Sequence, residues 1–194
     1  MVQIILASAS PRRRELLTRI TEDFKVKASD FKEDNISFKG DFPSYVKEIS
    51  MNKALNVAKT VKEEALIIGV DTIVALKNKV LGKPKDEEEA FSMLKALSGN
   101  NHEVYSGITV IKAPELTMIR DYACTKIKFD VLKDEEILEY ISTKEPLDKA
   151  GAYGIQGLAS VFVEEIHGCY YNVVGLPLNK LKKLLEAFDY CSGN

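Results

Sequence analysis

VQIILA at residues 2–7 runs directly into SASPRRR at residues 8–14, and this junction is the most informative part of the sequence. A short apolar run that ends in small hydroxyl residues is typical of a buried strand leading into a helix. Ser10 is a favourable N-cap, and Pro11 suits the first helical position, where no hydrogen-bonded N–H is needed. The first turn of such a helix offers free N–H groups and a partial positive charge, both of which favour bound phosphate. The junction therefore predicts a phosphate-binding loop at the edge of an α/β sheet, with hydroxyl and guanidinium groups from Ser8, Ser10, Arg12 and Arg13.

The composition is that of an ordinary globular chain. Its 194 residues, 45% of them hydrophobic, are enough to bury one substantial core. Because there are no linkers or repeats, we expect a single domain over residues 1–194. A formal net charge of −2 gives no electrostatic reason to expect nucleic acid or an anionic membrane as a partner. No run approaches the roughly 20 apolar residues of a membrane span, and the first residues lack the basic lead of a secretory signal. We therefore expect a cytoplasmic protein.

Several kinds of chemistry are excluded by the residues that the chain lacks. Three widely separated cysteines, Cys124, Cys169 and Cys191, match neither a disulfide framework nor a zinc site. With only two histidines, a histidine-rich metal centre is not expected. There is no P-loop motif and no serine in a nucleophile elbow. What remains is carboxylates, cations and hydroxyls that act on water beside a phosphate.

Apolar periodicity beyond the first junction predicts strands and helices in mixed order. A long β-branched run at residues 65–76 leads through Lys77-Asn78-Lys79 into a hairpin that ends at Leu81. Asp86 and Glu89 form a capping-box pattern ahead of an amphipathic helix. The other expected elements are a strand at 24–28, helices at 43–61 and 134–141, strands at 102–111 and 118–131, two strands within 158–174, and a last amphipathic helix after Pro177. Because hairpins are mixed with helices, we expect a mixed twisted sheet flanked by helices.

Asp71 is a carboxylate inside the otherwise apolar run IIGVDTIV at residues 67–74. A buried carboxylate without a partner is costly, so Asp71 requires a metal, a cation or several hydrogen-bond donors. The structural alternative is an aspartate at a strand end that caps a bulge at Gly69. We favour a functional role, because Asp71 and Thr72 interrupt the run together.

Lys53 and Lys83 are candidate cations for the phosphates. Lys53 falls on the apolar stripe of Ile49 and Val57 in the predicted 43–61 helix. Its ammonium therefore either extends along the helix to solvent or points into a polar site, and a nearby phosphate site favours the second. Lys83 lies in LGKP at residues 81–84, where a solvated loop lysine is the common alternative.

Glu33 lies in the acidic stretch SDFKED at residues 29–34, which on its own is typical of a solvated loop. An enzyme that cleaves a polyphosphate usually needs Mg²⁺ or Mn²⁺, held by one or two carboxylates together with substrate oxygens and water. Glu33 and Asp71 would suit such an ion if the fold brought them together.

The segment KAGAYGIQG at residues 149–157 carries closely spaced glycines. They predict a tight loop where a strand or a ligand comes close, and their spacing is not that of a dinucleotide-binding motif. Gln156 carries both a donor and an acceptor, which suits a base edge. A structural turn is the alternative that the segment favours when it is taken alone.

In their order along the chain, these motifs resemble the Maf family of nucleoside triphosphate pyrophosphatases. The matching segments span nearly the whole chain: LASASPRR at 6–13, GVDT at 69–72, GKP at 82–84, LSG at 97–99 with His102, DKAGAYGIQG at 148–157 and NVVGLP at 172–177. Mild departures from the family pattern at Ser106-Gly107 and Tyr170-Tyr171 lie outside the proposed catalytic set.

The resemblance implies an elongated mixed sheet with flanking helices, similar to the inosine triphosphatase group. It also implies hydrolysis of a nucleoside triphosphate to its monophosphate and pyrophosphate, with a divalent metal. Asp71 matches the proton acceptor that activates water, and Glu33 matches an acidic position near the metal. Ser8, Arg12, Lys53 and Lys83 match phosphate-binding positions, and Arg12, Thr72 and Gln156 match positions associated with base choice.

The loop around Gln156 resembles the subgroup that acts on dTTP and UTP, and modified pyrimidine nucleotides belong to the same expectation. Two alternatives stay open at this point. One is the same chemistry on a different nucleotide, such as 7-methyl-GTP. The other is a non-enzymatic protein that binds a division partner, because family members are linked to septum formation. The sequence does not set the preferred metal, the oligomeric state (a homodimer stays open) or a house-cleaning role.

Overall fold

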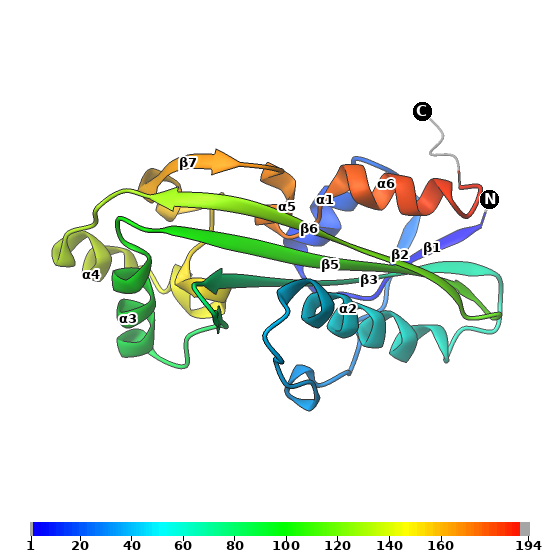
Figure 1. Ribbon diagram of the computed structural model, residues 1–194. Coiled ribbons are helices and arrows are strands. Elements are labelled where there is room, and N and C mark those ends of the chain that lie inside the picture. The colour runs from blue at the N-terminus through cyan, green and yellow to red at the C-terminus, as the bar shows by residue number, and fades with distance from the viewer. Residues whose placement is uncertain (1, 191–194) are drawn as a thin grey trace. The chain divides into compact units, whose positions relative to one another are not determined.

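The computed structural model describes residues 2–190, over which the chain forms one mixed sheet of seven strands together with six α-helices (Figure 1). The strands are β1 (Gln3–Leu6), β2 (Phe24–Val26), β3 (Ala65–Leu76), β4 (Lys79–Leu81), β5 (Asn101–Ala113), β6 (Thr117–Phe129) and β7 (Val163–His167). The helices are α1 (Pro11–Leu17), α2 (Phe42–Ala58), α3 (Glu87–Leu97), α4 (Asp134–Ser142), α5 (Tyr170–Val174) and α6 (Leu178–Glu186). Four short 3-10 helices are also present: η1 (Glu33–Asn35), η2 (Glu145–Asp148), η3 (Ala150–Ala152) and η4 (Leu158–Phe162).

Strand order in the sheet is β2-β1-β3-β5-β6-β7, with β4 paired to β3. β1 runs parallel to both β2 and β3, whereas β3 with β4, and β6 with β7, are antiparallel. The parallel pairing of β1 with β2 follows from α1, which separates them, and the antiparallel pairing of β3 with β4 follows from their short hairpin; β6 and β7 pair antiparallel although α4 lies between them in the chain. The predicted mixed sheet is therefore confirmed.

The residues group into two compact units. The first comprises the chain up to Asp71, Ser106–Ala123 and the part from Gly175 on; the second comprises Thr72–Tyr105 and Cys124–Val174. Each unit is assembled from separate stretches of the chain, so the division does not test the expectation of a single domain, which stays a prediction.

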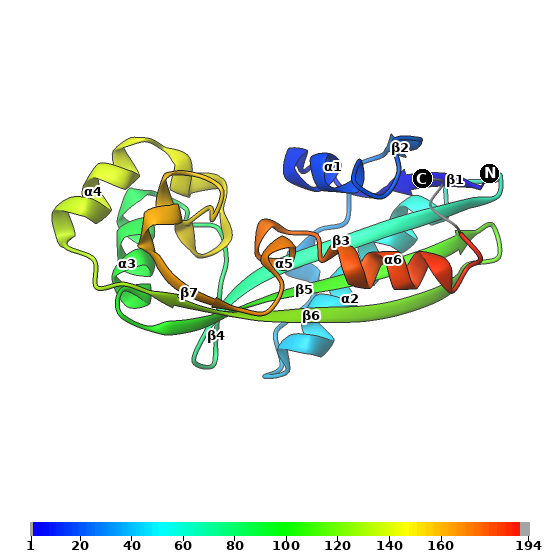
Figure 2. The same cartoon turned by 90° about the horizontal axis from the view of Figure 1, so that it is seen from above.

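In the first unit, α2 packs on one face of the sheet and α6 on the other (Figures 1 and 2). The α2 side contains a fully apolar cluster, made by small and branched side chains of α2, β1, β3 and β5: Ile5, Ala7, Ala54, Val57, Ala58, Ala65, Ile67, Ile111 and Ala113. On the other side α6 buries Leu181, Leu184 and Leu185, which confirms the predicted amphipathic helix.

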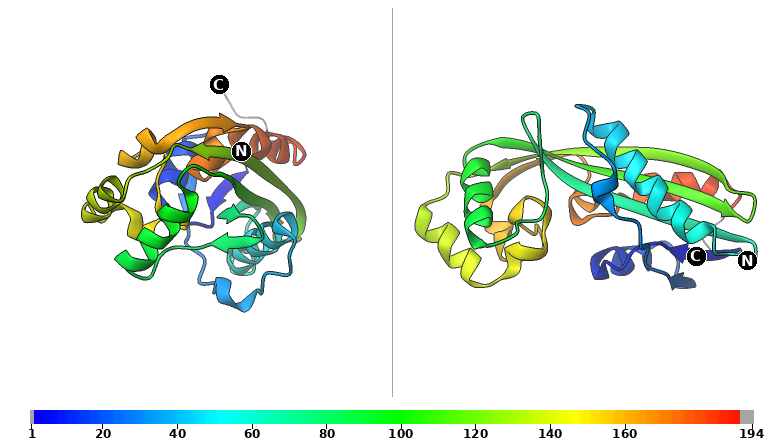
Figure 3. Two further views of the ribbon diagram at one scale, coloured as in Figure 1. Left: turned by 60° about the vertical axis from the view of Figure 1, so that its left-hand side comes forward. Right: turned by 90° about the horizontal axis from the view of Figure 1, so that it is seen from below.

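Figure 3 shows the long helix α2 lying against the sheet, and this close packing depends on Gly69 of β3. A Cβ at Gly69 would lie 2.2 Å from the Ser50 carbonyl oxygen and 2.7 Å from the Ala54 Cβ. These distances leave no room for a side chain, so only glycine allows the helix to lie at this depth. The segment of α2 that holds Ser50 and Ala54 also carries Lys53.

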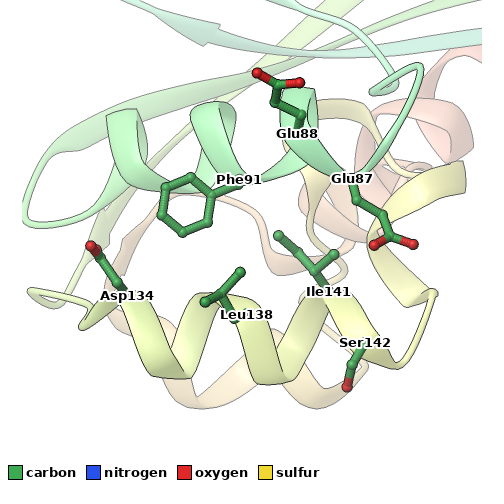
Figure 4. Close-up of a pocket in the computed structure, with 7 residues that line it drawn as sticks. All are labelled: Glu87, Glu88, Phe91, Asp134, Leu138, Ile141 and Ser142. Atoms are coloured by element: carbon green, nitrogen blue, oxygen red, sulfur yellow. The ribbon is translucent and has the colours of Figure 1, made fainter.

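The second unit contains α3 and α4 with the turns η2 and η3. Asp86 caps α3 as predicted, since its carboxylate accepts the Glu89 N–H at 2.8 Å. In a capping box the Glu89 carboxylate would accept the N–H of Asp86. Here Glu89 Oε2 accepts the N–H of the preceding residue, Lys85, instead. A shallow pocket of about 430 Å³ lies between α3 and α4 (Figure 4), with an apolar floor and acidic side chains at its margin: Glu87, Glu88, Phe91, Asp134, Leu138, Ile141 and Ser142.

Buried aromatic rings form the centre of the second unit. His102 packs edge to face on Phe129 and Tyr153, with ring centroids 4.9 and 5.4 Å apart. Its Nε2 lies 2.8 Å from the Tyr153 hydroxyl. Nδ1 is buried without a hydrogen-bond partner among the described residues. Burial lowers the pKa of His102 to about 4, so the ring is neutral at pH 7.

The expectation of two strands within residues 158–174 is wrong. Only Val163–His167 forms a strand, preceded by η4 and followed by α5. The physical reason lies in Asn172, which is fully buried. Its Nδ2 donates to the Val104 carbonyl oxygen and to Thr125 Oγ1, at 2.9 Å in both cases. A short helix directs this amide into the core. Contacts with residues so distant in the sequence cannot be recognised from the alternation of polar and apolar residues.

Over residues 2–190, no helix combines the length and the apolar character that crossing a membrane requires. Cys124 and Cys169 are free thiols. Cys191, the third cysteine of the sequence, lies outside the described residues.

Candidate active site

Asp71 lies inside β3, which continues unbroken from Ala65 to Leu76. The residue is only 3% exposed. Because side chains alternate along a strand, Asp71 shares the α2-facing side of β3 with Gly69. The alternative of a strand-end aspartate that caps a bulge is therefore wrong.

Lys53 supplies the cation that the buried Asp71 needs. It lies on α2 one turn from each of Ile49 and Val57, which are buried in the core. Its Nζ donates to Asp71 Oδ1 at 2.7 Å, and its side chain is 12% exposed. Of the two options that the sequence left for Lys53, an ammonium pointing into a polar site is confirmed.

Glu33, at the start of η1, joins the same cluster. Its Oε1 lies 2.6 Å from Lys53 Nζ, and its side chain is 55% exposed. The fold thus brings Glu33 and Asp71 together, the condition on which the predicted carboxylate pair depended. A lysine ammonium lies between them, which the sequence did not indicate.

Arg13 ties the strand–helix junction to the backbone beside Asp71. Its Nη1 donates to the Val70 carbonyl oxygen at 3.0 Å and to Ser8 Oγ at 3.2 Å, and its Nε donates to the Gly175 carbonyl oxygen at 3.0 Å. Burial lowers the pKa of Arg13, and the negative charges of Asp71 and Glu33 oppose that shift. Arg13 therefore orients the backbone at the site, a role that adds to the predicted contact with phosphate.

The two serines of the junction hold its shape. Ser10 is the N-cap of α1 as predicted, and its hydroxyl accepts the Arg13 N–H at 3.5 Å. Ser8 is buried, and its Oγ accepts the Ser10 N–H at 3.3 Å as well as the Arg13 guanidinium. Arg12 follows at the second position of α1 and is half-buried.

Tyr45 is a member of the site that sequence reasoning missed. Burial raises the pKa of its phenol, and the negative charges of Asp71, Glu33 and Asp34 raise it further. Tyr45, Ile49 and Lys53 are spaced by four residues on α2, so they lie along one face of the helix. That spacing is the signal which would have pointed to Tyr45.

The remaining candidates belong to the second unit. Thr72 is half-buried, and Lys83 and Gln156 are exposed. In the glycine-rich segment, Gly151 has φ +68°, and a Cβ there would lie 2.9 Å from Val74 Cγ2. The predicted close approach of a strand is thereby confirmed for Gly151. The assignments of Lys83 to phosphate binding and of Thr72 and Gln156 to base choice stay predictions.

Glu33 and Asp71 fit a hard divalent cation. An oxygen of each lies within 2.7 Å of one nitrogen, so the two carboxylates converge on a single cation position. Asp71 Oδ2 is buried and has no hydrogen-bond partner among the described residues. Mg²⁺ and Mn²⁺ prefer carboxylate oxygens. Within residues 2–190 no cluster of three or more His, Cys, Asp or Glu side chains suits a metal, so phosphate oxygens and water would have to complete the coordination.

This arrangement combines a proton acceptor with phosphate-binding groups. Asp71 Oδ1 is held by Lys53, while Oδ2 has capacity left for a proton. Beside Asp71, Arg13 links the predicted phosphate loop to the backbone at Val70. A buried, oriented carboxylate can act as a general base, and neighbouring cations can stabilise charge on phosphates. This combination is typical of a hydrolase that acts on phosphate anhydrides.

Comparisons with known proteins agree with this class. A model of the family of Maf-like proteins matches residues 3–188. A protein of Clostridium novyi (strain NT) named dTTP/UTP pyrophosphatase is 60% identical over 183 residues, which cover 94% of this chain and 96% of that protein. Another of the same name from Clostridium perfringens (strain SM101 / Type A) is 55% identical over 188 residues, 97% of this chain and 98% of that protein. The chain therefore belongs to the Maf family.

The fold has relatives of low sequence identity. A HAM1 protein from Coxiella burnetii superimposes with a TM-score of 0.52 at 14% identity, covering 96% of this chain and 100% of that chain. Likeness at this level of identity concerns the fold alone. It confirms the expected inosine-triphosphatase-like arrangement of a mixed sheet with flanking helices.

Proposed function

We propose that this chain hydrolyses dTTP and UTP to the corresponding monophosphate and pyrophosphate. The observation that carries the proposal is the buried Asp71 carboxylate, held at 2.7 Å by Lys53 through one oxygen while the other has no partner. Support for the substrates comes from the two Clostridium relatives, which bear the name of this activity. Nothing in the site favours a non-enzymatic role, which would have no use for a buried carboxylate and a lysine directed at each other.

In the proposed reaction Asp71 Oδ2 accepts the proton of the water that attacks the α-phosphorus. Without nucleotide, Lys53 keeps the carboxylate in one orientation through Oδ1. Arg12, Lys53 and Lys83 neutralise the triphosphate and stabilise charge on the departing pyrophosphate. Ser8 and Ser10 support the phosphate loop, and Arg13 holds that loop to the backbone next to Asp71.

A divalent cation completes the proposal. Glu33 and Asp71 would hold it, together with oxygens of the substrate. When bound, Mg²⁺ or Mn²⁺ supplies orientation of the phosphates and lowers the pKa of the attacking water.

Base choice is assigned to Arg12, Thr72 and Gln156. The side-chain amide of Gln156 offers one donor and one acceptor, which match a carbonyl and the N3–H of uracil or thymine. A base with a different edge would not form both of these hydrogen bonds and would bind less well. A cytoplasmic location and a homodimer stay predictions.

The test is pyrophosphate release from a panel of nucleoside triphosphates with Mg²⁺ or Mn²⁺. The panel includes dTTP, UTP, the four purine nucleotides, CTP, dCTP, 7-methyl-GTP and modified uridine triphosphates. We expect dTTP and UTP to be cleaved with the highest kcat/KM, and the activity to disappear with EDTA. Preference for 7-methyl-GTP would move the chain to another substrate class, and inactivity on the whole panel would favour a binding protein.

A further inference from the structure

Lys53 occupies the position to which the two carboxylates converge. Its Nζ lies 2.6 Å from Glu33 Oε1 and 2.7 Å from Asp71 Oδ1, both within ion-pair distance of the same nitrogen. The ammonium is well shielded, with 12% of the lysine side chain exposed and 5% of the aspartate side chain. One monovalent cation thus stands where a divalent cation would need the same two oxygens.

A lysine ammonium and a metal ion cannot share this position. Mg²⁺ binds oxygen at about 2.0–2.1 Å, and a second positive centre at hydrogen-bond distance from the same carboxylates would repel it strongly in a site of reduced dielectric. Without the ammonium, Glu33 Oε1 and Asp71 Oδ1 would lose the cation that they share, and Asp71, which is 3% exposed, would need another positive charge. The groups that would have to move are able to do so, because Glu33 is 55% exposed and lysine has a flexible four-carbon stem.

We infer that Lys53 is an internal cation that holds the metal position between Glu33 and Asp71 until nucleotide binds. The triphosphate then offers the ammonium other oxygens, Lys53 turns to the phosphates, and both carboxylates become available to the divalent ion. Without nucleotide the enzyme accordingly binds metal weakly. The inference rests on the proposed function, because it takes a nucleoside triphosphate as the ligand that draws Lys53 away.

Coupling of this kind is reciprocal. If the triphosphate raises the affinity of the enzyme for metal, the metal raises the affinity for the triphosphate by the same factor. When no substrate is present, Lys53 takes the place of the metal and keeps Glu33 and Asp71 paired. Metal-dependent water activation is thereby confined to the substrate complex.

The decisive experiment measures Mn²⁺ binding to the nucleotide-free protein by electron paramagnetic resonance. Lys53→Met and Lys53→Gln remove the competing charge, and glutamine keeps a hydrogen-bonding group. Both variants should bind Mn²⁺ about tenfold or more tightly than wild type, because a charge this close acts on the ion strongly. Lys53→Arg keeps the charge and should not bind more tightly. The gain should vanish when Asp71→Asn is added to Lys53→Met.

Lys112 provides a matched control. It forms an ion pair with Glu64 at 2.8 Å in the same unit, and Lys112→Met should bind Mn²⁺ as wild type does. The measurement is then repeated with a non-hydrolysable dTTP analogue. The analogue itself chelates Mn²⁺, but to the same extent in every sample, so differences between the proteins still report on the protein site. The difference between wild type and Lys53→Met should then shrink, because Lys53 no longer occupies the site.

Equal or weaker Mn²⁺ binding by the Lys53→Met and Lys53→Gln variants would overturn the inference. So would variants that unfold and stay unfolded at saturating Mn²⁺, since the freed carboxylates should be stabilised by the ion. The proposed function fails separately, if wild type releases no pyrophosphate. An active wild type with unchanged Mn²⁺ binding in the variants would reject only the role of Lys53.

Discussion

Ala54 of α2 lies directly over Gly69 of β3, so close that a Cβ on Gly69 would come within 2.7 Å of the Ala54 Cβ. Ala54 follows Lys53 in the sequence, and Gly69 precedes Asp71 by two residues on the same face of the strand. The contact between two small residues therefore sets how deep Lys53 reaches, and it explains why its ammonium lies 2.7 Å from the Asp71 carboxylate.

Gly69→Ala tests this dependence. The added methyl group forces α2 outward, and overpacking of a core typically costs about 1–3 kcal/mol. The free energy of unfolding should fall by about that amount, and kcat should fall by about tenfold or more because α2 carries Lys53 to a different position relative to Asp71 and the phosphates. Urea denaturation and steady-state kinetics measure the two effects. Gly82→Ala is the control for stability, since a Cβ there meets nothing within 4 Å; equal losses in both variants would contradict the proposed contact.

Asp71→Asn removes the proton acceptor but keeps the size of the side chain. Loss of a general base costs about 10²–10⁴-fold in rate, so kcat should fall into that range. Binding of a non-hydrolysable dTTP analogue, measured by calorimetry, should persist. Near-normal turnover would remove Asp71 from the mechanism.

Arg13→Lys separates orientation from charge. An ammonium is a single point charge and cannot span Val70, Gly175 and Ser8 as the guanidinium does. We expect kcat to fall by about tenfold or more with a smaller change in KM, because the backbone beside Asp71 loses its support. Arg14→Lys, at an exposed position of α1, should leave both constants unchanged. If kcat survives and only KM rises, Arg13 acts through its charge on the phosphates alone.

His102 should make the stability of the fold depend on pH. Its pKa is about 4 in the native protein, because the ring is buried, against 6.5 for an unperturbed histidine. Between these values the unfolded chain binds a proton that the native state does not, so stability falls as pH drops from 6.5 towards 4. At about 1.36 kcal/mol per pH unit the total loss is on the order of 3 kcal/mol.

Urea denaturation from pH 7 to pH 4 measures this dependence. His102→Gln cannot be protonated, so its stability should decline less over the same interval. A decline as steep as that of wild type would assign the effect to other groups.

Gln156→Ala tests the assignment of base choice. The variant loses the hydrogen bonds of this amide to the base edge, each worth about 0.5–1.5 kcal/mol, so the preference in kcat/KM for dTTP and UTP over other nucleotides should shrink correspondingly. Ser160→Ala, at an exposed position of η4, is the control and should retain the preference. An unaltered preference in Gln156→Ala would place base recognition elsewhere.

Features that depend on neighbours in the chain were predictable. The N-cap of α1, the presence of α2, the β3–β4 hairpin and the apolar face of α6 follow from backbone capping and from side-chain period, which act over a few residues; the predicted end of α2 at residue 61 lies three residues beyond its observed end at Ala58. Asp71 could be identified as a candidate in the same way. A carboxylate within an apolar run is visible in the local sequence, whatever the position of the strand in the sheet.

The second strand expected within residues 158–174 was wrong because a distant contact overrode the local pattern. Asn172 Nδ2 donates to the Val104 carbonyl oxygen and to Thr125 Oγ1, and a helical turn at Tyr170–Val174 places it there. Tyr45 could not be predicted as a site residue, because its electrostatic interaction with Asp71 arises only when α2 packs on β3.

The sequence by itself determined that this chain has a strand–helix phosphate loop and a buried acid, and that a lysine lies on the apolar stripe of a helix. Only the tertiary structure decided which groups meet: Lys53 between Glu33 and Asp71, and Arg13 on the carbonyl groups of Val70 and Gly175. The reason is that these pairs join segments far apart in the chain. Their distances are set by strand register and by how deeply one helix packs on the sheet, and local periodicity encodes neither.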